Sequence, residues 1–590
     1  MFMRHMGWWF GLVLGFTSVQ AQDAVGVDEH EELDSIVVTG TRISAGGAQD
    51  IGHFRMVAED GEMPRPESLT VEGLLSEHDL LLPLTRPCTQ LLCLATETLP
   101  QGLPSRPDDR LFVGLGFTSN VDAATWQREP LNLIAVVDQS GSMDGEPLAL
   151  VRQALAEIAG QMRTGDRLAI VLYGDAAHVH MPSRQLPQEA ETVRDAIAAI
   201  ESSGSTNMED GLQLGFATAR AAASTFPGNT RVMLFTDEQP NVGSTDAESF
   251  MGLATAASRD GIGLTTVGVG VQYDGTLARR IGSVRGGNLF FVADNESVQK
   301  LFRTELDTMV SEIAHDIRIT LKPVPGYRVS GVFGVPDGLL EQGRDGETTI
   351  VVPTAFFSTQ AGGIFLSLSK DEQRRFLPPA RLRPGETLLD LRLAYVAAAD
   401  GESSRDRLDV TAPATGAAPS EALRTAFALV DQFLVLRQAS ESYHRDGKPK
   451  LAFRQLSALL GRLQATGLAV LEPERKLVKA MTEKAALMSG YAGEVSAELI
   501  GGSLDGSWRI TRVVGAGLEV AVGDRCHLED GELCAVDAQD EELCEDFRFD
   551  GRVIDFPESN LRFAVRQTGE RMVLRAPQHG TRIELVRTEE

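Results

Sequence analysis

The sequence is poor in the side chains on which most enzymes and soft-metal sites depend. Its 590 residues include only 10 histidines and 5 cysteines, and no histidine neighbours the polar loop described below. No Ser/His/Asp or Cys/His nucleophile set, phosphate-binding glycine loop or zinc motif can be assembled from the sequence. We therefore expect a protein that is not an enzyme.

Positive charge is also scarce. The chain has 55 Lys and Arg residues against 83 Asp and Glu residues, so its formal net charge is -28. This balance argues against nucleic acid and anionic membranes as electrostatic partners. Hydrophobic residues make up 43% of the chain, which is enough for sizeable cores, and the length suits three or four domains.

Long apolar runs are missing beyond the amino terminus. The apolar run at residues 7–16 follows Arg4 and His5 and precedes Val19-Gln20-Ala21. A short basic start, an apolar core of this length and small residues at the end predict a signal peptide at residues 1–21. The run is too short to span a bilayer comfortably, so we expect export. Whether the mature protein is anchored stays open, since no lipid-attachment cysteine follows the run.

The stretch 131–143 combines a buried strand with a polar loop. Leu133–Val137 is continuously apolar, as expected of a central parallel strand covered on both faces. The strand ends at Asp138, and Ser140 and Ser142 follow at alternate positions. A carboxylate and two hydroxyls are hard oxygen ligands, which favour magnesium, manganese or calcium over zinc or copper. The loop also follows the carboxyl end of a parallel strand, where open α/β folds bind their ligands.

Two further segments supply oxygen ligands. Residues 204–207 precede a predicted helix and provide Thr206, and a second apolar strand, Val232–Thr236, ends at Asp237. Because the carboxyl ends of parallel strands meet at one edge of a sheet, these side chains are expected to converge. The side chains predicted to hold the metal are Asp138, Ser140, Ser142, Thr206 and Asp237.

The pattern Asp138-x-Ser140-x-Ser142, followed by Thr206 and Asp237, resembles the metal-ion-dependent adhesion site (MIDAS) of von Willebrand factor type A (vWA) domains. The resemblance implies a doubly wound, Rossmann-like α/β domain. It implies that Ser140, Ser142 and Thr206 bind the cation directly or through water. Asp138 and Asp237 would act mainly through waters, and an Asp or Glu of a partner protein would fill the open coordination position. Few direct ligands and retained waters favour Mg²⁺ over Ca²⁺ or Mn²⁺.

The sequence departs from the family at a position beside the site. Many vWA domains have glycine after the last aspartate of the motif, whereas this chain has Glu238. The additional carboxylate either tunes the metal or occludes its open position. The sequence does not decide between these two effects.

Residues 22–50 are acidic and then rich in glycine, and we expect them to be disordered. They include Leu33–Ile43, which resembles the TonB box of outer-membrane TonB-dependent receptors. Ile36–Thr39 would then add as a strand to the sheet edge of a partner, TonB or another envelope protein. The alternative is a tethered edge strand of this protein. The docking motif implies a Gram-negative source and a periplasmic or outer-membrane-associated protein.

Periodicity and composition divide the remaining chain. Residues 61–75 resemble the segment that precedes the vWA domain in a bacterial secreted family, and the helical pattern of residues 420–489 breaks near Gly447-Lys448-Pro449. We predict a vWA-associated amino-terminal segment at 51–110, a vWA domain at 111–315, a β-sandwich at 316–412, a helical hairpin at 420–489 and a small β domain at 500–590.

The cysteines fall into two groups. Cys88 and Cys93 either close a small disulfide loop or remain thiols. The spacing of Cys526, Cys534 and Cys544 suits one disulfide and a spare thiol better than a zinc knuckle. Separately, His178 and His180 alternate on a predicted edge strand, where exposed rings are favoured over a metal site.

These observations favour an exported adhesion or scaffold protein that binds an acidic residue of a partner protein through a divalent cation. One alternative is a structural envelope protein whose metal site is vestigial or only stabilising, which Glu238 supports. A second alternative is a non-catalytic enzyme subunit. The sequence does not identify the partner.

Overall fold

The computed structural model describes residues 40–588, with gaps. The gaps are residues 123, 224, 238–246, 271–279, 281–283, 337–338, 344–345, 371–381, 490–503, 505, 515–520, 530–531, 537–541, 550–552, 557–558, 560, 569–570 and 577–580. The predicted signal peptide, Ile36–Thr39 and Glu238 therefore lie outside the described residues. Among the helices that the structure describes, none is both long and apolar enough to cross a bilayer.

Seven strands form the sheet of the α/β domain, in the spatial order β2-β10-β9-β8-β5-β6-β7. Their bounds are β2 (Gly47–Ala48), β5 (Leu131–Asp138), β6 (Arg167–Tyr173), β7 (Ala177–Gln185), β8 (Asn229–Thr236), β9 (Gly263–Val269) and β10 (Gly287–Val292). The pairs are parallel except for β6 with β7. Strand β5 lies inside the sheet, and every one of its residues is buried.

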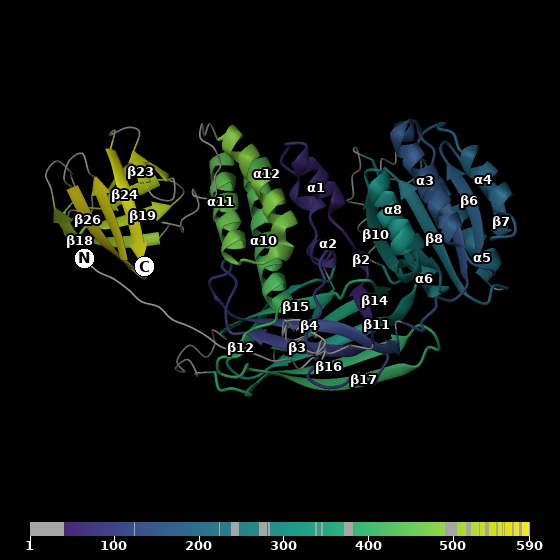
Figure 1. Cartoon of the computed structure of the whole chain (residues 1–590), viewed down its shortest axis with the longest axis horizontal. Helices are drawn as coiled ribbons and strands as arrows, with labels where there is room; N and C mark the ends of the chain where they lie inside the picture. The colour runs from purple at the N-terminus through teal and green to yellow at the C-terminus, as the bar shows by residue number, and fades with distance from the viewer. Residues whose placement is uncertain are drawn as a thin grey trace, which may run out of the picture. The chain divides into compact units, whose positions relative to one another are not determined.

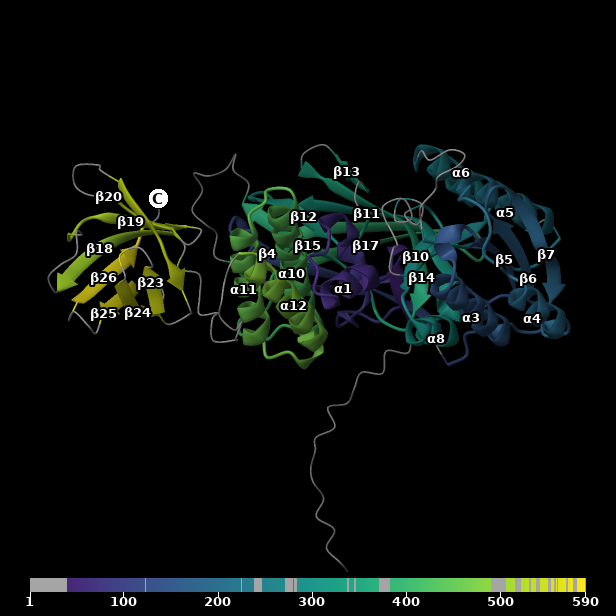
Figure 2. The same cartoon turned by 90° about the horizontal axis from the view of Figure 1, so that it is seen from above.

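Helices cover both faces of this sheet, as the doubly wound prediction requires. Alternate residues of β5 point to opposite faces. Leu133, Ala135 and Val137 pack with α3 (Glu146–Gln161), α4 (Ala190–Ala198) and α8 (Asn295–Thr304). Ile134 and Val136 pack with α5 (Met208–Ala223) and α6 (Ala247–Arg259). Figure 2 shows the two helical layers on either side of the strands.

Glycines let α5 approach the sheet closely. A Cβ atom on Gly215 would lie 2.4 Å from Val136 Cγ2, and one on Gly211 would lie 2.6 Å from Tyr173 Cδ1. Real Cβ atoms do not approach other atoms this closely, so a larger residue at either position would push the helix off β5 and β6. The helix therefore presses directly on the strands whose ends form the candidate site.

A second sheet has ten strands, in the order β12-β15-β4-β1-β14-β11-β16-β17, with β13 paired to β14 and β3 paired to β4. Their bounds are β1 (Gly40–Ala45), β3 (Cys93–Leu99), β4 (Asp109–Asp122), β11 (Glu312–Pro323), β12 (Tyr327–Phe333), β13 (Leu340–Gln342), β14 (Thr348–Ser358), β15 (Gly363–Lys370), β16 (Thr387–Ala397) and β17 (Ser403–Thr411). The Thr98 hydroxyl donates to the Thr411 carbonyl at 3.0 Å, so the curved sheet brings β3 close to β17.

This sheet differs from the predicted β-sandwich of residues 316–412 in two ways. It is one continuous sheet, and it also takes strands from segments that precede the α/β domain. Strand β4 was assigned to the α/β domain but pairs with β15 and β1. Strand β1, in the segment expected to be disordered, lies between β4 and β14. The physical reason is that β4 is buried on both faces and needs partners and cover from distant segments.

The helical region contains α10 (Glu421–His444), α11 (Pro449–Ala465) and α12 (Glu472–Met488). The first two helices meet at the predicted break near Gly447. The region is not a separate hairpin, because α1 (Gly52–Glu59) and α2 (Val71–Ser76) share its core. Figure 1 shows α1 beside α12. Residues 51–110 are therefore divided between this helical body and the ten-stranded sheet, rather than forming a segment of their own.

The carboxy-terminal domain is a nine-stranded antiparallel sheet in the order β21-β20-β19-β18-β26-β25-β24-β23-β22. Its strands are β18 (Gly506–Val514), β19 (Arg525–Glu529), β20 (Glu532–Val536), β21 (Glu542–Asp546), β22 (Arg548–Phe549), β23 (Val553–Phe556), β24 (Leu561–Thr568), β25 (Arg571–Ala576) and β26 (Thr581–Arg587). The two ends of this path, β21 and β22, are separated in sequence by Phe547 alone, so the sheet must curve round on itself. We call this curved sheet the carboxy-terminal barrel.

The structure decides between the alternatives that the sequence left open for the cysteines. Cys88 is bonded to Cys93, and Cys534 is bonded to Cys544. Cys526 is the spare thiol, and it is buried in the core of the carboxy-terminal domain. Burial raises the pKa of the Cys526 thiol to about 12, which keeps the thiol protonated and unreactive at neutral pH.

Candidate metal centre

Two neighbouring parallel strands bring the predicted carboxylates to the same edge of the α/β sheet. Strand β5 ends at Asp138, and β8 ends at Thr236, one residue before Asp237. Val137 is paired with Phe235 on the neighbouring strand, so Asp138 lies one residue and Asp237 two residues beyond this pair. Both residues are buried, and the charge of Asp237 acts on the Asp138 carboxyl.

The loop after β5 folds its two serines together. The Asp138 Oδ1 atom accepts a hydrogen bond from the Ser140 backbone N–H at 2.9 Å, which turns the chain sharply after the strand. The Oγ atoms of Ser140 and Ser142 are 3.1 Å apart. Ser140 is buried, whereas Ser142 is exposed. The loop therefore presents two adjacent hydroxyl oxygens beside the buried carboxylate.

Backbone hydrogen bonds hold the Thr206 segment against this loop. The N–H of Gly141 donates to the Gly204 carbonyl at 3.1 Å, and the N–H of Ser203 donates to the Gln139 carbonyl at 2.5 Å. Gly204 has a φ of +82°, a left-handed conformation that favours glycine. Thr206 follows two residues later and is buried. The structure thus brings all five predicted side chains to one edge of the sheet.

Two residues that the sequence interpretation missed fix the orientation of Asp138. The hydroxyls of Tyr173 and Thr236 donate to Asp138 Oδ2 at 3.1 Å and 3.2 Å. Together with the Ser140 N–H, they engage both carboxylate oxygens with protein donors. Their positions at the ends of β6 and β8 were a usable signal, since side chains there face the same edge as Asp138.

The electrostatics of the site suit a cation. Burial and the charge of the Asp237 carboxylate together raise the pKa of Asp138 to about 6, against hydrogen bonds that lower it. Burial also raises the pKa of Tyr173, as does the charge of Asp138. Two buried carboxylates so close together repel each other, and a divalent cation would relieve that repulsion. The donor set is composed of carboxylate and hydroxyl oxygens, so it fits a hard cation such as Mg²⁺.

The histidine pair lies where the sequence indicated. Strand β7 is at an edge of the α/β sheet, and it carries both His178 and His180. The Nε2 atom of His180 is 2.8 Å from the Ala196 carbonyl oxygen, and the two rings are 6.3 Å apart. His180 is therefore engaged with the backbone of α4 rather than oriented for a shared metal.

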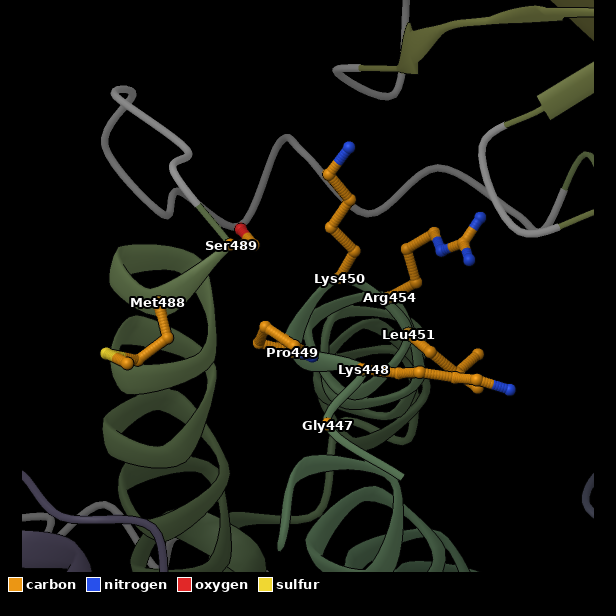
Figure 3. Close-up of a pocket in the computed structure, with 8 residues that line it drawn as sticks. All are labelled: Gly447, Lys448, Pro449, Lys450, Leu451, Arg454, Met488 and Ser489. Atoms are coloured by element: carbon orange, nitrogen blue, oxygen red, sulfur yellow. The ribbon is translucent and has the colours of Figure 1, made fainter. Parts of the chain in front are cut away.

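A hollow elsewhere in the molecule is unrelated to this centre. It lies where α10 gives way to α11 and is lined by Gly447, Lys448, Pro449, Lys450, Leu451, Arg454, Met488 and Ser489. Figure 3 shows the side chains of Lys450 and Arg454 extending away from α11. All of these residues belong to the helical region, so the hollow adds nothing to the candidate metal centre.

Tyr173→Phe is expected to weaken Mg²⁺ binding by roughly 10-fold, because one donor that orients Asp138 is lost. The ring would keep its packing against Gly211, so the fold should lose only about 1 kcal/mol. Isothermal titration calorimetry measures the affinity, and Tyr443→Phe on α10 is the matched control. Unchanged affinity in Tyr173→Phe would show that the hydroxyl does not position the carboxylate.

Comparisons with known proteins identify the α/β domain. Residues 132–304 match the model of the von Willebrand factor type A domain, which confirms the predicted vWA domain; the matched residues begin after β4. The protein named "Uncharacterized protein YfbK", from Escherichia coli (strain K12), is 30% identical over 198 residues, which are 33% of this chain and 34% of that protein. Inter-alpha-trypsin inhibitor heavy chain H1 of Mesocricetus auratus is 28% identical over 149 residues, covering 24% of this chain and 16% of that protein.

Solved structures give a weaker match. The structure titled "von Willebrand factor type A from Catenulispora acidiphila" is 14% identical and aligns with a TM-score of 0.40, covering 68% of this chain and 88% of that one. The sequence match to YfbK covers about a third of either protein. The similarity to curated relatives therefore concerns the vWA domain and not the whole chain.

Proposed function

We propose that this chain is a metal-dependent protein-binding protein. Its vWA domain would hold a divalent cation, Mg²⁺ before Ca²⁺ or Mn²⁺, and an Asp or Glu of a partner protein would complete the coordination. The observation that carries the proposal is the convergence of Asp138, Ser140, Ser142, Thr206 and Asp237 on one edge of the sheet.

The side chains of the site would have two different roles. The Ser140, Ser142 and Thr206 hydroxyls would contact the cation directly or through water. Both oxygens of Asp138 are already engaged by protein donors, which supports a role through water and charge rather than direct ligation. A cation with few direct carboxylate ligands stays electrophilic, and it therefore attracts an acidic side chain.

Export and an envelope location belong to the same proposal. The apolar run of residues 7–16 would direct export, and the disulfide between Cys88 and Cys93 is consistent with an oxidising compartment. Ile36–Thr39 would dock on TonB or another envelope protein. Cell fractionation tests the location, and loss of crosslinking to TonB after deletion of Ile36–Thr39 tests the docking. A cytosolic protein, or crosslinking that survives the deletion, would contradict these parts of the proposal.

The function is tested by capture from a periplasmic and outer-membrane extract. Immobilised protein should retain a partner in Mg²⁺ and release it in chelator. Asp138→Ala should lose capture, whereas Asp195→Ala, which removes an exposed carboxylate on α4, should keep it. Mass spectrometry of the retained protein identifies the partner.

One alternative has a specific observation in its favour. Glu238 stands where many vWA domains have glycine, and its carboxylate would block the open position. The protein would then be a structural envelope protein with a vestigial or purely stabilising metal site. Partner capture that persists both in chelator and in the Asp138→Ala variant would favour this alternative.

A further inference from the structure

The carboxy-terminal barrel has opposite charges toward its two ends. The side chains of Trp508, Ile510 and Leu585 are buried in the interior of the barrel. Since side chains alternate across a strand, the neighbouring positions Arg509 and Glu584 face outward. The outward positions of β25, β26, β18 and β19 carry a basic patch, which we define as Arg509, Arg512, Arg525, Arg575 and Arg582.

The basic patch sets like charges directly opposite each other. Arg509 is the cross-strand partner of Arg525, and Arg575 is the partner of Arg582. Such pairs repel and weaken a sheet unless an anion lies between them. Glu584 pairs with Arg582 at 2.8 Å and approaches Arg512 at 3.8 Å. Among the residues that the structure describes, no carboxylate forms an ion pair with Arg509 or Arg575, so these two side chains give the patch an excess of positive charge.

The same barrel carries the opposite arrangement on β20 and β21. Glu532 and Asp546 are exposed and are direct cross-strand partners, a pair that we call the acidic pair. Residues 532–546 contain seven acidic residues and no Lys or Arg. Here too the sheet sets like charges against each other, and a cation from outside would relieve the repulsion.

The strand register keeps the two charged groups apart within one molecule. The acidic pair lies one position beyond the pairing of Leu528 with Gly506, the first residue of β18. Arg582 is instead paired with Val514, the last residue of that strand. Eight residues of extended strand separate these ends, which is roughly 26 Å at about 3.3 Å per residue. The acidic pair therefore cannot neutralise Arg575 and Arg582 of its own barrel.

We propose that the carboxy-terminal barrel binds a second copy of this chain, with the basic patch of one copy against the acidic pair of the other. The argument is charge complementarity: each surface carries the charges that the other one lacks, and the acidic pair cannot reach Arg575 and Arg582 of its own barrel. The contact joins two different surfaces, so it leaves one of each free and permits chains of molecules. Salt screens the net charge of -28 beyond about 8 Å at physiological ionic strength, whereas charges in direct contact are screened less.

Sedimentation velocity of the full chain tests the proposal across a concentration series. At about 0.05 M salt, where the Debye length is roughly 14 Å, the weight-average sedimentation coefficient should rise with concentration. At about 0.5 M salt, where the length is roughly 4 Å, the rise should be much smaller. Arg509→Glu/Arg575→Glu should remove the concentration dependence. The matched control is Arg328→Glu/Arg405→Glu, which makes the same charge change on exposed positions of β12 and β17 and should not remove it.

A charge swap distinguishes the proposed contact from loss of folding. Glu532→Arg/Asp546→Arg alone should also sediment as a monomer. An equal mixture with Arg509→Glu/Arg575→Glu should associate again, because each variant then presents the charge that the other needs. Wild-type protein that shows no association at low salt would overturn the proposal. So would a mixture that stays monomeric although both variants keep the wild-type circular dichroism spectrum, or an acidic peptide that binds the basic patch while the chain itself stays monomeric.

Discussion

Asp237→Asn is expected to abolish measurable Mg²⁺ binding while making the metal-free protein more stable. Asp138 and Asp237 are buried together, and the charge of Asp237 raises the pKa of Asp138 in addition to the effect of burial. Neutralising one carboxylate removes this repulsion. The free energy of unfolding of the metal-free protein should therefore rise by about 1 kcal/mol, which is roughly the free energy that corresponds to a shift of one pKa unit. The same change removes half of the carboxylate charge that attracts the cation, so affinity should fall by more than about 100-fold.

Two measurements check this prediction. Titration calorimetry should show Mg²⁺ binding by wild type and none by Asp237→Asn. In thermal unfolding, Mg²⁺ at about 100 times its dissociation constant should stabilise wild type by roughly 2.7 kcal/mol and leave the variant unchanged. Asp195→Asn, on the exposed face of α4, should behave as wild type in both assays. A variant that binds Mg²⁺ normally, or that is less stable than wild type without metal, would contradict the assignment.

Glu474→Gln should destabilise the helical body by about 2–3 kcal/mol, because it replaces charged hydrogen bonds in the core by neutral ones while Arg55 keeps its ion pair with Glu77. Glu474 lies on α12 and is fully buried. Its Oε1 atom is 2.6 Å from Arg55 Nη2 and 2.9 Å from His78 Nε2, and its Oε2 atom accepts from Gln432 Nε2 at 2.5 Å. The carboxylate thus joins α12 to α10, to α1 and to His78, which lies two residues after α2.

The pH dependence of this contribution has a definite sign. Burial alone would raise the pKa of Glu474, but the hydrogen bond with His78 and the charge of Arg55 lower it on balance below the ordinary value of 4.5. The folded state therefore holds the proton less tightly than the unfolded state does. The stabilisation is present above about pH 4.5 and is lost as the pH falls through the lower pKa of the folded state.

Urea unfolding followed by circular dichroism measures the effect of Glu474→Gln. The control is Glu472→Gln on the same helix, where the side chain is 56% exposed and pairs with Arg475, so the expected cost is below about 1 kcal/mol. Equal midpoints for the two variants would show that the Glu474 network does not hold the helices together. A large shift for Glu474→Gln alone would confirm that the chain before the vWA domain and the chain after it fold as one body.

The sequence by itself determined the vWA domain, and it predicted that the five candidate ligands lie at one edge of its sheet. Strand β5 is an apolar run that ends in Asp138, and parallel strands have their carboxyl ends at one edge, so local pattern and chain order are enough to predict convergence. The disulfide between Cys88 and Cys93 was also foreseeable as one of two alternatives, since only five residues separate the thiols.

Only the tertiary structure decided which distant segments share a sheet or a core. Strand β4 has apolar residues on both faces, but its sequence does not say that one face packs with β11 and β14 and the other with α10. The contacts of Tyr173 with Asp138 and of Glu474 with Arg55 likewise join residues 35 and 419 positions apart. A local pattern predicts that an apolar face must be buried or that a buried charge must be paired. Which segment buries the face or pairs with the charge depends on how the whole chain packs, and the local pattern does not contain that information.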